Sequence, residues 1–183
     1  GVISQIEKND ILKFGHSKRV AKNAVAIMQF LEIDAETKSK FIPSLKLTGL
    51  LHDIGKMGVS VDLLSKRLKL TPAELSKIRM HPEIATSIFS SSEGFKEVAK
   101  GIRHHHERWD GKGYPDKLKG KEIPLSSLII SVVETFDALI NNLTHPIKSP
   151  DALKIISDEA GKQFSPKVVS AFIEAVKKGK IET

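Results

Sequence analysis

Cysteine is absent from this sequence of 183 residues, which excludes disulfide bonds, thiolate metal ligands and cysteine nucleophiles. Aromatic residues are scarce, with one tryptophan and one tyrosine, so we do not expect the stacking surface that binds single-stranded nucleic acid. The longest apolar candidate, residues 125–133, contains three serines and is far shorter than the roughly 20 residues of a membrane-spanning helix. Residues 1–13 lack the apolar stretch of a signal peptide, and we expect a cytoplasmic protein.

The composition is that of an ordinary globular chain, with 40% apolar and 28% charged residues. The length suits one domain with a single core, and we expect no second domain. Lysine and arginine exceed aspartate and glutamate by 29 to 22, a net charge of +7 that favours anionic ligands. Because basic residues form neither a long run nor a helical stripe, a small phosphorylated ligand is a better expectation than a nucleic acid.

Apolar residues recur at intervals of three and four, which predicts an all-α domain. The expected helices cover residues 17–31, 35–52, 71–81, a short segment from 82, 95–105 and 125–142. Pro43 predicts a kink or a break in the second of these helices. Ser149-Pro150 and Ser165-Pro166 are N-cap and first-position pairs that open two further helices.

Six of the seven histidines lie at expected helix ends or in one cluster: His16, His52, His81, His104, His105 and His106. A lone helical histidine is more often a surface or capping residue than a ligand. Three adjacent imidazoles, however, cost core packing without apolar burial, which favours a functional interpretation. Since His52 precedes Asp53, several helices are expected to converge on one metal pocket.

Three segments together resemble the HD-GYP domain, the bacterial cyclic-di-GMP phosphodiesterase branch of the HD superfamily. They are His52-Asp53-Ile54-Gly55-Lys56, then His81-Pro82-Glu83-Ile84, then the sequence HHERWDGKGYP at residues 105–115. The first segment alone marks the broad superfamily, whereas the third marks the branch. The resemblance implies one HD-GYP-like domain over residues 1–183, with a core at about 16–169 and a metal centre between helices.

The resemblance also implies the chemistry of the site. It assigns metal ligation to His16, His52, Asp53, His81, His105, His106 and Glu134. Asp53 would bridge two divalent ions, with iron or manganese favoured, and a bridging hydroxide would attack cyclic-di-GMP to give pGpG or GMP. Lys56 would bind the reacting phosphate, beside a loop with Gly113, Tyr114 and Pro115 that contacts the substrate. His104 is not expected to be a ligand.

The sequence departs from the family pattern at several places, among them Ser60 and Val61, where proline and aspartate are usual. Glu134 stands where aspartate is usual, and Leu12 stands where members with three metals have glutamate, so we expect two metals. The arginine and tyrosine that usually follow the late helix are missing, with Leu143 near the place of the arginine.

Two other interpretations therefore stay open. The chain could be a weakly active or inactive module that binds cyclic-di-GMP or docks a GGDEF-domain partner through residues 110–115. It could also hydrolyse another cyclic dinucleotide or a nucleotide monoester.

Overall fold

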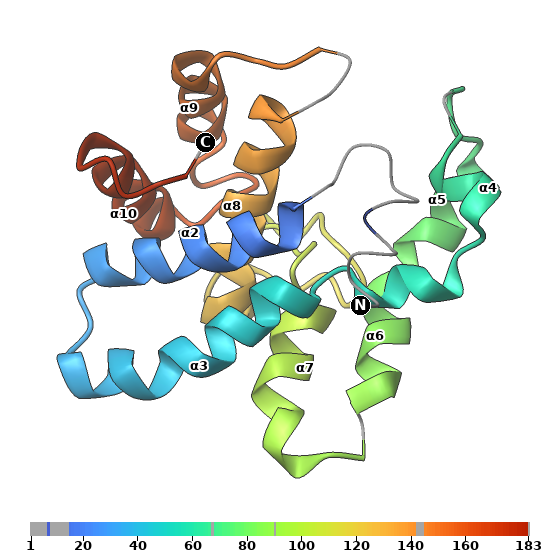
Figure 1. The fold of residues 1–183 in the computed structure, drawn as a ribbon, viewed down its shortest axis with the longest axis horizontal. Coiled ribbons are helices and arrows are strands. Elements are labelled where there is room, and N and C mark those ends of the chain that lie inside the picture. The colour runs from blue at the N-terminus through green and yellow to red at the C-terminus, as the bar shows by residue number, and fades with distance from the viewer. Residues whose placement is uncertain (1–6, 8–14, 67, 90, 142–144, 183) are drawn as a thin grey trace.

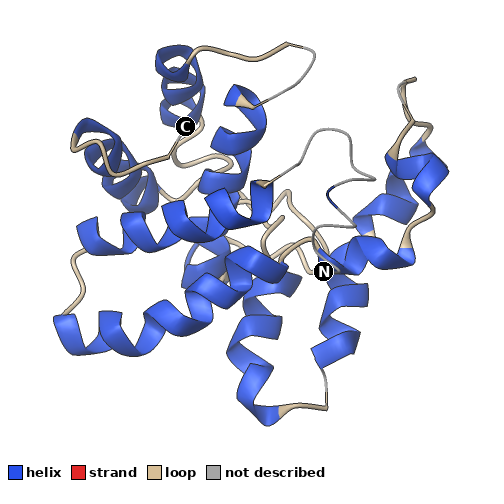
Figure 2. Ribbon diagram, in the orientation of Figure 1, coloured by secondary structure: helices blue, strands red, loops and turns tan. Residues whose placement is uncertain are grey.

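A computed structural model describes residues 7, 15–66, 68–89, 91–141 and 145–182. These residues form helices and short 3₁₀ turns without a β-strand, which confirms the predicted all-α fold (Figures 1 and 2). The α-helices are α2 (His16–Phe30), α3 (Ala35–Leu51), α4 (Val61–Leu64), α5 (Pro72–Arg79), α6 (His81–Phe89), α7 (Lys96–Arg103), α8 (Leu125–Ile140), α9 (Ser149–Asp158) and α10 (Pro166–Lys177). The 3₁₀ turns are η1 (Ile54–Gly58), η2 (Glu93–Phe95) and η3 (Gly120–Glu122).

Helix α8 is the centre of the packing, because it contacts α2, α3, α7, α9 and α10. Its apolar residues are buried along most of its length, as the run of leucine, isoleucine and valine predicts. Phe136 of α8 meets Phe172 of α10 edge to face, with ring centroids 5.0 Å apart. The main core therefore extends through α10 and joins both halves of the chain in one helical domain.

Most helix ends follow local signals. Thr71 and Glu74 form a capping box at the start of α5, as expected from the threonine, proline and glutamate there. Helix α3 continues through Pro43, so of the predicted kink or break the break does not occur. Ser149 is the first residue of α9, whereas Lys148 occupies the N-cap that was predicted for the serine.

The part of the chain that the structure describes contains no helix long and apolar enough to span a membrane. Helices α4 and α5 form an arm that projects from the body beside α6 (Figure 1). At the base of this arm, Gly55 in η1 lies against the start of α6. A Cβ atom at Gly55 would lie 1.8 Å from the carbonyl oxygen of His81, so only glycine permits this approach.

Candidate metal centre

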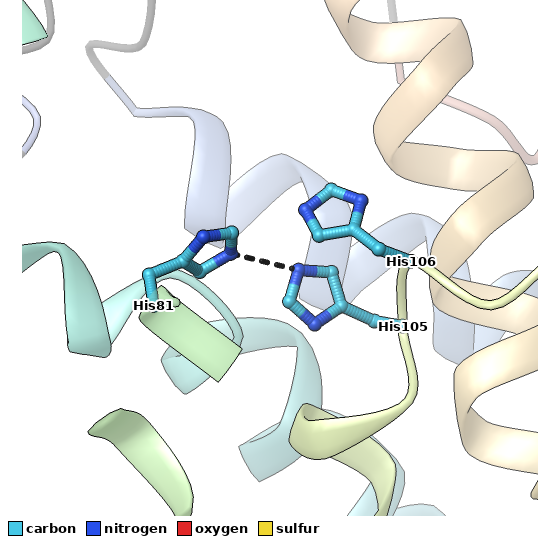
Figure 3. A group of neighbouring side chains, drawn as sticks. All are labelled: His81, His105 and His106. Atoms are coloured by element: carbon cyan, nitrogen blue, oxygen red, sulfur yellow. Dashed lines mark hydrogen bonds between the residues drawn. The ribbon is translucent and has the colours of Figure 1, made fainter. Parts of the chain in front are cut away.

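The seven side chains expected to bind metal lie where α2, the end of α3, the start of α6, the turn after α7 and α8 meet. They form two groups, and within each group the ligand atoms lie within 4.8 Å of one another. The first group is His81, His105 and His106, and the second is His16, His52, Asp53 and Glu134. Figure 3 shows the three histidines of the first group facing one another.

In the first group, the Nε2 atoms of His81 and His105 lie 3.3 Å apart (Figure 3). The Nδ1 atom of each ring contacts a backbone carbonyl oxygen three residues earlier, that of Ile78 for His81 and that of Ile102 for His105. A carbonyl oxygen only accepts, so each Nδ1 carries the hydrogen and each neutral ring presents an Nε2 lone pair. Two facing lone pairs repel each other, and a cation between them removes the repulsion.

The second group repeats this arrangement. The Nε2 atoms of His16 and His52 lie 3.3 Å apart. His52 donates from Nδ1 to the carbonyl oxygen of Gly49 at 2.9 Å, and His16 donates from Nδ1 to the Asp137 carboxylate at 2.6 Å. The second pair of Nε2 lone pairs therefore also fits a cation, and hydrogen bonds of this kind orient histidine ligands in metal sites.

Asp53 lies between the two groups. Its Oδ2 is 3.5 Å from Nε2 of His52, and its Oδ1 is 3.4 Å from Nε2 of His81. One carboxylate thus turns one oxygen toward each group, which is the arrangement of a bridging ligand. The Nζ atom of Lys56 donates to Oδ2 of Asp53 at 3.0 Å.

The surroundings keep the imidazoles neutral, which is the form that binds metal. Burial lowers the pKa of His52 to about 3 and that of His81 to about 4, although the Asp53 charge opposes the shift at both rings. Burial also lowers the pKa of His106. At neutral pH these three rings are therefore unprotonated ligands.

Glu134 reaches the centre from α8, despite the extra methylene relative to the usual aspartate. Its Oε2 lies 4.0 Å from Nε2 of His105, and its carboxylate belongs to the group of His16 and His52. The longer side chain is therefore accommodated at the centre rather than directed away from it.

The loop after α7 closes one side of the centre. The Tyr114 ring stacks on His106 with centroids 4.8 Å apart, and the Tyr114–Pro115 peptide bond is cis. A Cβ atom at Gly113 would lie 2.4 Å from the backbone nitrogen of Arg108, so this glycine lets the loop fold back on itself. His104 lies outside both groups and contacts the Asp116 carboxylate at 2.9 Å, and its lack of a ligand role stays a prediction.

A cavity of about 470 Å³ opens beside the first group. His105, His106 and Glu134 form the wall nearest the centre, and Gly113 and Tyr114 line the loop side. Pro115 and Lys56 are not part of the lining. The cavity therefore connects the expected metal ligands with two of the three expected loop residues.

Asp137 and Arg19 also belong to the centre, although neither was expected there from the sequence. Asp137 accepts hydrogen bonds from His16 and, at 2.6 and 3.0 Å, from Arg19. Burial opposes the charge of Asp137, but these hydrogen bonds lower its pKa, so it stays a carboxylate. Its position in the sequence could have indicated Asp137, because it follows Glu134 by three residues and therefore shares its helix face. Leu12 and Leu143, two other departures from the family pattern, lie outside the described residues.

Comparison with known proteins supports the same family. A family model described as HD domain matches residues 3–168. A cyclic di-GMP phosphodiesterase of Thermotoga maritima is 39% identical over 143 residues, covering 75% of this chain and 38% of that protein. A cyclic di-GMP phosphodiesterase of Vibrio cholerae is 33% identical over 185 aligned positions, covering 94% of this chain and 38% of that protein. The chain thus spans 38% of the length of each of these relatives.

A solved structure has the same fold. An HDG"Y"P protein from Bdellovibrio bacteriovorus superimposes with a TM-score of 0.70 at 24% identity, covering 88% of this chain and 51% of that one.

The paired histidines and the carboxylates of this chain form a site for divalent metal. The matched family model shows that the chain belongs to the HD domain family, and residues 105–115 carry the motif that resembles its HD-GYP branch.

Proposed function

We propose that this chain is a phosphodiesterase that hydrolyses cyclic-di-GMP at a centre of two divalent metal ions. The observation that carries the proposal is Asp53, which turns one oxygen toward each of two histidine groups. The names of the two bacterial relatives support the choice of substrate.

One ion would be held by His81, His105 and His106, the other by His16, His52 and Glu134, and Asp53 would bridge them. Nitrogen and oxygen donors without sulfur suit iron, manganese or zinc, and the resemblance to the HD-GYP family favours iron or manganese, which we propose as the metals. Bound there, two divalent ions would neutralise charge on a phosphodiester and make neighbouring water more acidic.

The protein's own residues then position the substrate. Hydrolysis forms a bond from water oxygen to phosphorus and breaks a bond from phosphorus to a ribose oxygen, which leaves with a proton. Lys56 is a compact cation beside Asp53 and suits the reacting phosphate. Gly113, Tyr114 and Pro115 shape the loop that bounds the cavity. The first hydrolysis gives linear pGpG, and a second gives GMP.

We further propose that residues 1–183 act as one HD-GYP domain with its core at about 16–169, working in the cytoplasm. Docking of a GGDEF-domain partner through residues 110–115 stays a prediction. The inactive binding module is not favoured, because the whole expected ligand set meets at one place and Glu134 reaches it.

Metal analysis combined with hydrolysis assays tests the proposal. Protein purified without chelator should contain about two iron or manganese ions per chain and should hydrolyse cyclic-di-GMP in iron(II) or manganese(II). Asp53→Asn should lose metal and activity together, whereas Asp62→Asn, an exposed control, should keep both. Full activity in Asp53→Asn would contradict the bridging role. Tight binding of cyclic-di-GMP without hydrolysis would favour the binding module.

A further inference from the structure

The cavity beside the metal centre is lined by three cationic side chains, and they differ in their contacts. Arg108 is committed to the protein. It donates to the Asp110 carboxylate at 2.9 and 3.1 Å and to Gln163 at 3.0 Å, and Glu159 lies 3.7 Å away. The carboxylates of Asp110 and Glu159 therefore balance the charge of Arg108.

Arg79 and Lys112 are different. Arg79 lies in the last turn of α5, is exposed, and holds its guanidinium 5.2 Å from the centroid of the Tyr114 ring. Among the described residues, neither the Arg79 guanidinium nor the Lys112 ammonium forms an ion pair with a carboxylate, although the Lys112 charge helps to lower the pKa of the nearby Asp110 carboxyl. A guanidinium on an aromatic face keeps its edge N–H groups available for a ligand.

Arg79 lies in the same cavity as the metal ligands but at a distance from them. The rings of His105 and His106 are 4.0 Å apart, the Tyr114 ring stacks next at 4.8 Å, and the Arg79 guanidinium follows. The Arg79 guanidinium therefore contacts the Tyr114 ring, which in turn stacks on the expected ligand His106. Its contact is with Tyr114 and not with a metal ligand, so we assign Arg79 to a part of the substrate other than the phosphate at the metal centre.

We propose that Arg79, assisted by Lys112, binds the second, non-reacting phosphate of a cyclic dinucleotide. This inference rests on the proposed function. A cyclic dinucleotide carries two phosphodiesters, and only one can occupy the metal centre during hydrolysis. The other needs a cationic partner elsewhere in the cavity, and a guanidinium edge matches two phosphate oxygens with two parallel hydrogen bonds.

Kinetics with two substrates test the inference on the metal-loaded protein. Cyclic-di-GMP carries two phosphates, whereas bis(4-nitrophenyl) phosphate carries one. Arg79→Ala should lower the ratio of kcat/KM for cyclic-di-GMP to that for the single-phosphate diester at least about tenfold, the effect of losing a charge-assisted contact. Arg79→Lys should recover part of the loss, and Lys112→Ala should lower the ratio by a smaller factor, because an ammonium does not form the paired contact.

Lys77→Ala is the matched control, since it removes one positive charge from the same last turn of α5 but does not line the cavity. An unchanged ratio in Arg79→Ala, or the same fall in Lys77→Ala, would overturn the inference. If the starting protein hydrolyses neither substrate, the proposed function fails. The inference is then judged by calorimetric binding of cyclic-di-GMP. It stands if Arg79→Ala binds about tenfold more weakly than Lys77→Ala, and it falls if the two bind equally or if the starting protein does not bind.

Discussion

Single hydrogen bonds decide which nitrogen of each histidine faces the centre. His52, His81 and His105 are anchored at Nδ1 by carbonyl oxygens three residues earlier in the chain, so each points Nε2 inward. His16 has no such carbonyl and depends on the Asp137 carboxylate of another helix. The orientation of His16 is therefore the one that a distant side chain controls.

Asp137→Asn tests that dependence. An amide has nearly the same shape but lacks the charge that holds His16 and Arg19. We expect metal affinity to fall roughly 10–100-fold while the fold remains, which is the usual cost of losing such a partner. Metal titration monitored by calorimetry provides the measurement. Asp158→Asn, which changes an exposed pair with Lys154, is the control, and equal affinities in the two variants would show that Asp137 does not orient the ligand.

Glu134→Asp tests whether the longer side chain is an adapted ligand. The glutamate carboxylate already lies within the group of His16 and His52, so shortening it by one methylene withdraws the oxygens. We expect lower metal content and a loss of roughly a hundredfold in cyclic-di-GMP hydrolysis, as displacement by about an ångström can cause. Glu97→Asp, at an exposed site, should change neither quantity. Faster hydrolysis in Glu134→Asp would mean instead that the site is suited to the family aspartate.

Lys56→Ala separates substrate binding from metal binding. The ammonium repels cations, so its removal should not reduce metal content, although it lies 3.0 Å from Asp53. We expect weaker binding of cyclic-di-GMP, seen as a KM raised about tenfold or more. Metal analysis and steady-state kinetics on the same preparation provide the two readouts. Loss of metal from Lys56→Ala would show instead that the lysine holds the metal ligand Asp53 in place.

At the scale of secondary-structure elements, the close approach of the η1 and α6 backbones determines the geometry of the metal centre. Turn η1, with Asp53 as its N-cap and Lys56 within it, lies beside the first residue of α6, which is His81. Gly55 makes this possible, since its missing side chain leaves room for the carbonyl of His81 and the backbone nitrogen of Ala85. The two histidine groups share Asp53 because η1 and α6 touch here.

Gly55→Ala should therefore move α6 away from η1. We expect a free energy of unfolding lower by about 1–3 kcal/mol, together with reduced metal content because His81 shifts from Asp53. Denaturant unfolding and metal analysis measure the two effects. Gly94→Ala is the matched control, because a Cβ atom there meets nothing within 4 Å. Normal metal content in Gly55→Ala would show that the contact does not position His81.

At the scale of the whole molecule, folding buries neutral imidazoles that the unfolded chain would protonate. The pKa values of His52 and His81 fall from 6.5 to about 3 and about 4 on folding. Between these values and 6.5 the unfolded state binds more protons, so stability falls as the pH is lowered through this range. The metal centre and the stability of the fold are thereby coupled through the same residues.

The metal-free protein should therefore lose thermal stability between pH 6.5 and about 4, with the melting temperature as the measurement. His145→Ala, which changes an exposed histidine outside both groups, should show the same fall. A combined His52→Gln and His81→Gln variant should show a shallower one, because its side chains do not titrate there. A melting temperature that stays constant over this range in the starting protein would contradict the burial of neutral rings.

Local patterns in the sequence were enough to predict the all-α class and most helices. Apolar spacing and the Thr71 capping box involve residues that are close in sequence, so they can be recognised without knowledge of the tertiary structure. The ligand types followed from motifs, and the motif residues do meet in the structure. The bridging place of Asp53 was already implied by the family resemblance, whereas tertiary structure alone decided that Asp137 holds His16 across 121 residues and that Arg79 lies over Tyr114. These contacts join segments distant in sequence, and only the packing of helices around α8 and the approach permitted by Gly55 bring them together.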